Sequence, residues 1–556
     1  MAPGPKILRR AALSLALLLS ACAGGRAETG PSPTTSLYGA FMAGNYAAAT
    51  GHEAEAANFF ATAIARDPAN RDLLRRGFIA ALLARSPERI ALAKRLGNDP
   101  LALMVRANAA LETGNYAAAA QDFAAMPKFG VTGLVRPLLL AWAEAGAGKT
   151  GTAIAGLTRL DAAAPFGPVY ALNAALIADF AGREAEAAPL YRIAERAFPA
   201  PNLRLAQALA SWQARQGNTE SAYAVLVHMA ASHPDLDLAL PALERNAAKP
   251  MIGSARDGVA EAYLTLAGSL GQPAQALLRK ILLGFALELR PDLSAARLLQ
   301  ANLDVSLGKR ASAAATLAAI KPGDPLHAPA VMQRAEILDG LGKGATMLPA
   351  LAALAKSHPH SAAPLTLAGD IERDAKHYAA ARALYSRALA RLGPNPPGSA
   401  WAIIYGRAIT EDKLNDWPQA DADLHRALAL DPGQPFVLNY LGYSYALRGI
   451  HLAHAQKMIE QALQVDPNEG AIIDSLGYTL LRRGKIAHAM RVQIRAVQRA
   501  PDDAEVNAHL ADIFYAAGDR LAARNQWARA LALHPDPAEK AKIEAALKRH
   551  GIEAGS

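Results

Sequence analysis

Three short strings in the chain resemble motifs that carry out known chemistry. Residues 143–150 read AEAGAGKT, a loose phosphate-loop string, residues 306–309 read SLGK, an SxxK string, and residues 442–446 approach GxSxG. A phosphate loop needs a strand before it and a helix after it, and the serine motifs need partner motifs elsewhere in the chain. Neither condition is met in this Ala-rich and Leu-rich sequence, so we expect none of these strings to be catalytic.

Metal and redox chemistry have equally little support in the sequence. His451 and His454 stand three residues apart and His488 follows, a spacing that could hold a metal on a helix. The chain has no HExxH motif, and its single cysteine, Cys22, excludes disulfides and CxxC redox motifs. We therefore predict no metal site, no cofactor and no enzyme activity.

The N-terminus reads as a targeting segment with Cys22 at its end. Three cations, Lys6, Arg9 and Arg10, precede an apolar run of 11 residues, 11–21. This run is shorter than the roughly 20 residues of a spanning helix, so it predicts a signal peptide at 1–21. The sequence Leu-Ser-Ala-Cys at its end resembles a lipobox, the motif at which bacteria cleave and attach lipid to the cysteine.

Lipid on Cys22 would tie the chain to a membrane, because two or more acyl chains anchor stably. Residues 22–36 are rich in Gly, Pro, Ser and Thr and predict a flexible tether. By the usual rule for bacterial lipoproteins, Ala23 after the cysteine favours the outer membrane, with the protein facing the periplasm. The formal net charge of +9 is mild for 556 residues, and an exported chain rarely meets DNA, so we expect no nucleic-acid partner.

The elements that would carry any binding site are repeated helical hairpins. Alanine raises the hydrophobic content to 52% while aromatics stay at 6%, which favours close-packed helices over sheets. Turn residues recur along the chain, and many successive ones are 34 or 35 residues apart: Gly51, Gly114, Gly148, Gly182, Gly217, Gly271, Gly308, Gly342, Lys376, Asn415, Gly449, Gly484 and Gly518. The long first gap leaves room for one degenerate pair around 71–96.

Each unit carries the same small residues at fixed positions. The unit ending at Pro501 has Leu476-Gly477 in its first helix, Gly484 at the turn, and Ala489 and Ala496 in its second helix. This pattern matches the tetratricopeptide repeat (TPR), and it implies an all-α fold, a right-handed α-solenoid of TPR hairpins. Interior glycines cost about 1 kcal/mol against alanine, so we expect Gly369, Gly442 and Gly477 to lie where the two helices cross.

The repeat pattern divides the chain into an ordered series of segments. We predict a first TPR array at 37–229, an irregular insertion at 230–256, a second array at 257–535 and a capping helix with a tail at 536–556. The insertion is a second candidate binding segment beside the groove of the arrays.

The TPR resemblance also implies which side chains line the concave groove. Positions one after and three before the repeat glycine point inward, and neighbouring units add further residues: Tyr405, Asn439, Tyr443, Asp474, Tyr478, Asp512 and Tyr515. Rings with Asn and Asp along a groove suit an extended peptide. The alternative is that these tyrosines only pack between adjacent helices. A Lys/Asn carboxylate clamp, as in chaperone-binding TPR proteins, is not evident.

Residues 437–490 (VLNYLGYSYALRGIHLAHAQKMIEQALQVDPNEGAIIDSLGYTLLRRGKIAHAM) resemble a family of proteobacterial TPR outer-membrane lipoproteins. The family includes the lipoprotein adaptor of the carboxyl-terminal processing protease. The resemblance implies a non-enzymatic adaptor whose protein partners are that protease and its cell-wall hydrolase substrates. The alternative is a scaffold in an envelope export or polysaccharide secretion complex.

Overall fold

The computed structural model describes residues 36–160, 166–197 and 201–549. All regular structure in these ranges is helical, with no strand, which confirms the predicted all-α repeat fold. Cys22, the predicted signal peptide and all of the predicted tether except Ser36 lie outside the described residues.

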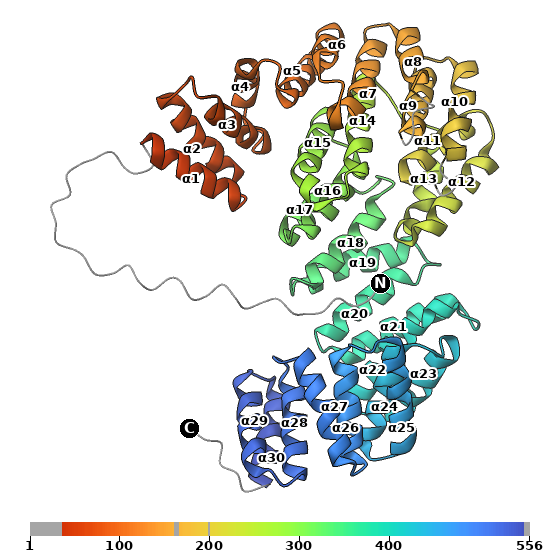
Figure 1. Cartoon of the computed structure of the whole chain (residues 1–556). Coiled ribbons are helices and arrows are strands. Elements are labelled where there is room, and N and C mark those ends of the chain that lie inside the picture. Colours follow the sequence, from red (N-terminus) through yellow and green to blue (C-terminus); the bar gives the residue numbers. More distant parts are fainter. Residues whose placement is uncertain (1–35, 161–165, 198–200, 550–556) are drawn as a thin grey trace, which may run out of the picture. The chain divides into compact units, whose positions relative to one another are not determined.

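Consecutive helices pair as antiparallel hairpins, and the turns between them follow the predicted positions (Figure 1). Twelve of the thirteen predicted turn residues have a positive φ, including the two that are not glycine, Lys376 (64°) and Asn415 (62°). Left-handed backbone at this point ends the first helix and favours glycine, which lacks a Cβ. The degenerate pair is also present, as α3 and α4 with Arg85 (φ 54°) at their turn.

Gly271 is the exception among the predicted turn residues. It lies between two helices of a hairpin, but its φ is not positive. The preceding helix ends in an extended residue, Leu270, and the chain then enters a 3-10 helix at Pro273–Gln275. This hairpin is closed by a longer connection, so no left-handed cap is needed there.

The chain forms two compact units that interleave in sequence. The first unit spans residues 1–199 and 250–296, and the second spans 200–249 and 297–556. Helices of the first unit are α1 (Leu37–Ala49), α2 (Glu53–Arg66), α3 (Arg71–Leu83), α4 (Glu88–Leu96), α5 (Pro100–Glu112), α6 (Tyr116–Ala125), α7 (Gly130–Gly146), α8 (Thr150–Thr158), α9 (Gly167–Phe180), α10 (Glu184–Ala197), α14 (Ala255–Ser269) and α15 (Ala276–Leu289).

The second unit contains the remaining helices and the most regular repeats. These are α11 (Leu203–Arg215), α12 (Thr219–Ser232), α13 (Leu240–Asn246), α16 (Ser294–Ser306), whose start belongs to the first unit, α17 (Arg310–Ala318), α18 (His327–Asp339), α19 (Leu348–Ser357), α20 (Ala363–Asp374), α21 (Tyr378–Leu392), α22 (Trp401–Lys413), α23 (Trp417–Leu430), α24 (Pro435–Arg448), α25 (Leu452–Val465), α26 (Gly470–Arg482), α27 (Ile486–Arg499), α28 (Ala504–Ala516), α29 (Arg520–Ala532) and α30 (Pro537–Arg549). Short 3-10 helices cover Pro234–Ala239, Gly344–Met347 and Gly398–Ala400.

In the first unit, the hairpin α14/α15 packs back against the first helices of earlier hairpins. Helix α14 contacts α7 and α9, and α15 contacts α3 and α5 (Figure 1). The buried Tyr263 hydroxyl donates to Asn108 Oδ1 on α5 at 3.0 Å, and Gly258 lies directly against the buried ring of Trp142 on α7. Salt bridges join this hairpin to α2 and α4, through Lys280 with Glu53 and Glu288 with Arg89.

The interior glycines lie at helix crossings. A Cβ on Gly369 would lie 2.8 Å from the Tyr385 ring, and one on Gly442 would lie 2.8 Å from Ile459 and 3.0 Å from the Ala455 carbonyl oxygen. A Cβ on Gly477 would collide with the Gln493 side chain. In each case the neighbour belongs to the second helix of the same hairpin, so the missing side chain lets the two helices approach closely.

The stretch 230–256, expected to be an irregular insertion, holds the end of α12, the 3-10 helix Pro234–Ala239 and α13. Leu236, Leu238 and Leu243 bury their side chains and give these short elements a packed face. At the other end, α30 packs on α28 and α29 and buries Ile543 and Leu547. No helix in the described ranges is both long and apolar enough to cross a bilayer.

Candidate functional site

The candidate site is the face formed by the first helices of four consecutive hairpins, α22, α24, α26 and α28. These helices contact their neighbours directly, α24 with α26 and α26 with α28. All seven residues predicted to line the groove lie on them. We call this surface the first-helix face.

Three of the predicted residues, Tyr443, Asp474 and Tyr478, come together in one cluster with His509. The Tyr443 and Tyr478 rings meet edge to face with centroids 5.5 Å apart, and the Tyr478 ring lies 4.6 Å from the His509 ring. The Tyr443 hydroxyl donates to Glu505 Oε1 on α28 at 2.8 Å. The cluster therefore joins α24 to α28 across the intervening α26.

Asp474 is buried inside this cluster. His509 Nδ1 lies 2.9 Å from Asp474 Oδ2, and the buried Gln493 amide donates to Asp474 Oδ1 and, at 2.9 Å, to the Val506 carbonyl oxygen. Since the Asp474 residue is only 6% exposed, its carboxylate is engaged within the fold and does not face a ligand.

Electrostatics hold a positive charge on His509. Burial disfavours the imidazolium, but the charge and the hydrogen bond of Asp474 outweigh burial, with help from Glu505 and Asp512, and the pKa of His509 rises to about 9. Burial, followed by the Glu505 carboxylate, raises the pKa of the Tyr443 hydroxyl well above its usual range. Near neutral pH the cluster thus contains a protonated His509 beside Asp474 and a neutral Tyr443 phenol.

Tyr405 belongs to a second aromatic group, with Trp401 and Tyr440. Its ring meets Tyr440 edge to face at 5.8 Å and lies 6.3 Å from Trp401. The Tyr440 hydroxyl donates to Asp412 Oδ2 at 2.8 Å. Burial raises the pKa of the Tyr405 hydroxyl to about 12. This group extends the row of half-buried rings onto α22.

Asp512 and Tyr515 form a third group on α28, beside the buried Trp527. The indole Nε1 of Trp527 donates to Asp512 Oδ1 at 3.1 Å, and the Tyr515 ring lies 6.0 Å from the indole. Asn439 on α24 is half-buried, and its buried Oδ1 has no hydrogen-bond partner among the described residues. The tyrosines pack between helices and keep part of their surface exposed, so groove binding stays a prediction.

Sequence reasoning missed His509, Glu505 and Tyr440. Tyr440 and His509 occupy one repeat slot, directly before Leu441 and Leu510. Both side chains reach towards the first helix of the preceding hairpin, Tyr440 to Tyr405 and His509 to Asp474. The unit between them has Ser475 in that slot, so the available signal was a ring in two of three consecutive units.

The motif strings have structural explanations. Helix α7 precedes Gly148, which adopts φ 81° in a repeat turn, so the phosphate-loop string lacks the required strand. The Ser306 hydroxyl donates to the Leu303 carbonyl oxygen at 2.7 Å, and Ser444 is buried within α24. A search of the described residues finds no group of three or more His, Cys, Asp or Glu side chains suited to a metal.

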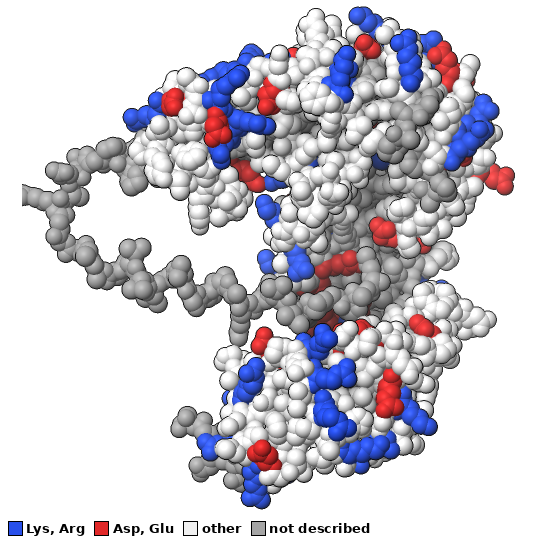
Figure 2. Space-filling view, in the orientation of Figure 1, with Lys and Arg blue, Asp and Glu red and all other residues white. Residues whose placement is uncertain are grey.

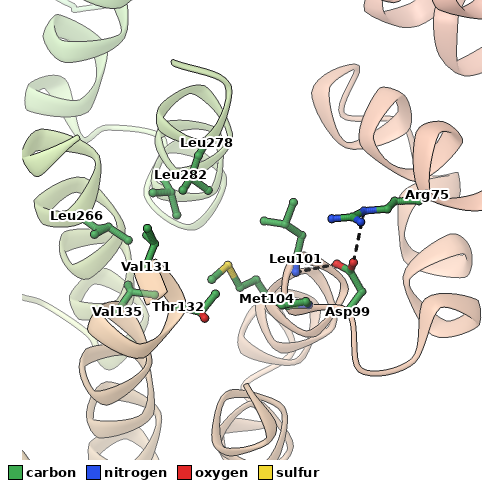
Figure 3. A pocket seen from close by; sticks show the side chains of 11 residues that line it. Arg75, Asp99, Leu101, Met104, Val131, Thr132, Val135, Leu266, Leu278 and Leu282 are labelled. Carbon is green, nitrogen blue, oxygen red and sulfur yellow. Dashed lines mark hydrogen bonds and ion pairs between the residues drawn. The ribbon is translucent and has the colours of Figure 1, made fainter. Parts of the chain in front are cut away.

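A second candidate is a cavity of about 190 Å³ in the first unit (Figure 3). Helices α5, α7, α14 and α15 line it with apolar side chains, and Arg75 and Asp99 lie at its edge with Nε and Oδ2 3.8 Å apart. Asp99 Oδ1 also caps α5 by accepting from the Leu101 N–H at 3.0 Å. The polar groups here are used by the fold, so the cavity offers no reactive constellation.

Comparison with known proteins supports a TPR protein. No family model matches the chain. The TPR repeat-containing protein PA4667 of Pseudomonas aeruginosa is 32% identical over 110 residues, which are 20% of this chain. The match spans only 18% of the length of that relative. This match supports the repeat type. It carries no information on the activity of the whole relative.

Solved TPR structures resemble the chain at low identity. A TPR protein from Parabacteroides merdae gives a TM-score of 0.37 at 17% identity, covering 45% of this chain and 96% of its own. The Cut9–Hcn1 hetero-tetramer of APC/C gives 0.36 at 14% identity, covering 93% and 91%. Yeast Tom70 gives 0.34 at 13% identity, covering 93% and 96%.

Proposed function

We propose that this TPR chain is a non-enzymatic adaptor that binds protein partners on the first-helix face of its second unit. The observation that carries the proposal is the row of half-buried rings on α22, α24, α26 and α28. Such rings offer apolar surface to a bound segment and lose little conformational entropy on binding.

Tyr478 is the ring best placed for contact with a partner. It is partly exposed, its hydroxyl accepts from Arg482 Nη1 at 3.1 Å, and the exposed guanidinium lies 5.8 Å from its ring centroid. Tyr443, in contrast, is tied to Glu505 and supports the fold as well. A segment with apolar and acidic side chains would meet both the rings and Arg482.

The proposal extends to location and partners. Lipid on Cys22 would hold the chain at the outer membrane, facing the periplasm. The partners are a processing protease and its cell-wall hydrolase substrates. The lipobox string, the tether composition and the resemblance of the repeats support this extension. Changing Cys22→Ser should move the protein from the membrane fraction to the soluble fraction, or leave it as an uncleaved precursor.

The binding face is tested with a photo-crosslinking amino acid placed at Tyr478 in the full chain, in cells. We expect it to capture the protease or a hydrolase, and Tyr443→Ala with Tyr478→Ala to lose these partners in affinity capture while keeping native helicity. Truncating a hot-spot ring costs about 2 kcal/mol or more. Two such losses correspond to about a thousandfold weaker binding if they add.

Tyr223 provides the matched control, since it is 45% exposed on α12, a second helix. A crosslinker at this position, or Tyr223→Ala, should leave partner capture unchanged. The proposal fails if a folded double variant captures the same partners at wild-type yield. If the double variant melts early, the test passes to Tyr478→Ala alone, and wild-type capture by that folded variant also refutes the proposal.

A further inference from the structure

Helix α1 carries an apolar stripe that no other described part of the first unit covers. Tyr38, Met42 and Tyr46 repeat every four residues and are 74%, 51% and 73% exposed, with Leu37 beside them at 40%. The helix has no charged residue over its 13 positions. Figure 2 shows Lys and Arg side chains over the helices that follow α1 in the first unit. A terminal repeat normally presents a polar outer face, so this stripe needs another explanation.

The stripe is not needed to hold α1 on its hairpin. The opposite side of α1 buries Ala40, Gly44 and Ala47 against α2. A flanking side is held by Phe41, whose ring lies 6.5 Å from Phe60, and by Asn45, which accepts from Arg76 Nη1 at 3.1 Å. These contacts hold α1 on its hairpin without any contribution from the stripe.

We infer that the stripe on α1 docks onto a lipid surface next to the anchor. This inference rests on the proposed lipidation of Cys22. Only 13 residues separate Cys22 from Ser36, the N-cap of α1. Even a fully extended chain of that length spans at most about 50 Å. An anchored Cys22 therefore keeps α1 near the membrane surface at all times.

The chemistry of the stripe suits the boundary between headgroups and acyl chains. Tyrosine is enriched there because its ring is apolar and its hydroxyl stays in contact with water. The absence of charge on α1 removes the cost of desolvating ions. Arg76 lies 5.5 Å from the Phe41 ring centroid at the flank, but its guanidinium is paired with Asp72 Oδ2 at 2.7 Å, so the apolar stripe itself carries the docking.

A second copy of the chain fits the stripe less well. With about 150–250 Å² for a fully buried aromatic side chain, the four exposed side chains present on the order of 500 Å². A stable interface buries about 800 Å² on each partner. The stripe alone is too small for that, whereas a lipid-anchored chain needs only a weak additional contact, because the anchor supplies a high local concentration.

The test uses the mature protein, isolated from cells and added to vesicles of phosphatidylethanolamine and phosphatidylglycerol. With Cys22 blocked by lipid, Met42→Cys supplies a single free thiol for an environment-sensitive fluorophore. Helices at this boundary insert about 5–10 Å, so we expect blue-shifted emission that lipid-borne nitroxides quench. Leu521→Cys is the matched control, since Leu521 is 68% exposed on α29, and its label should stay in water and unquenched.

The possible results separate the two proposals. If the protein floats with the vesicles but the label on Met42→Cys stays in water, docking is refuted and lipidation stands. If the protein does not float, both are refuted. Self-quenching that disappears on dilution within the membrane shows that a second copy covers the stripe, and it overturns the inference. Adding Tyr38→Ser and Tyr46→Ser should abolish lipid quenching while flotation persists, and retained quenching also refutes docking.

Discussion

Protonated His509 should stabilise the C-terminal hairpins below pH 9, and removing it should abolish this pH dependence. The group is only 7% exposed and is bonded to Asp474, and its pKa of about 9 compares with an ordinary value of 6.5. Each unit of difference between the folded and the unfolded pKa contributes about 1.4 kcal/mol to the free energy of unfolding. The shift of His509 therefore contributes at most about 3 kcal/mol to stability.

The direction follows from linkage. Since the folded pKa lies above the unfolded pKa, the folded state binds the proton more tightly. The full contribution is present below about pH 6.5 and is lost as the pH rises through about 9. Stability of the region around α26 and α28 should therefore fall between pH 6.5 and pH 9.

The assay compares wild type with His509→Gln. Repeat proteins open locally, so hydrogen exchange of peptides from α26 and α28 is followed at several pH values, corrected for the intrinsic exchange rate. The variant should have lower protection at pH 6, by up to about 3 kcal/mol, with the difference shrinking towards pH 10. Groups titrating elsewhere cancel in this comparison. A difference that stays constant from pH 6 to pH 10 would refute the reasoning.

Three further predictions concern stability. Gly477→Leu should cost about 1–3 kcal/mol in urea unfolding, because its side chain collides with Gln493. Gly156→Leu on α8 meets open space and should instead raise stability by up to about 1 kcal/mol, the helix propensity that glycine lacks. Lys376→Gly should raise stability by about 0.5–1 kcal/mol, since φ is 64° there, and an unchanged melting temperature would contradict this. Burial, followed by the charge of Asp423, raises the pKa of the Glu411 carboxyl to about 7, although Arg407 acts in the opposite direction. Because this pKa lies above the ordinary value of 4.5, the folded state loses stability as the pH rises from about 4.5 to 7. Glu411→Gln should therefore melt higher than wild type at pH 8 and no higher at pH 4.

Local features of the fold were accessible from the sequence because the repeat constraints are local. A left-handed turn needs a residue that tolerates positive φ, and a close helix crossing needs a missing side chain. The spacing of Gly484 and Gly518 and the interior position of Gly477 therefore predicted turns and a crossing that the structure contains. Gly271 also lies between the two helices of its hairpin, but without the left-handed cap, because the chain makes a longer connection there.

Tertiary structure alone decided which side chains remain available to a partner. Asp474 follows the groove pattern, yet His509 lies 35 residues further along the chain and engages its carboxylate. The return of α14 onto α5, where Tyr263 meets Asn108 across 155 residues, has no periodic signal either. Periodicity reports which face of a helix is buried within its own hairpin. It does not report which distant helix reaches that face, because that depends on the summed rotation of all the hairpins in between.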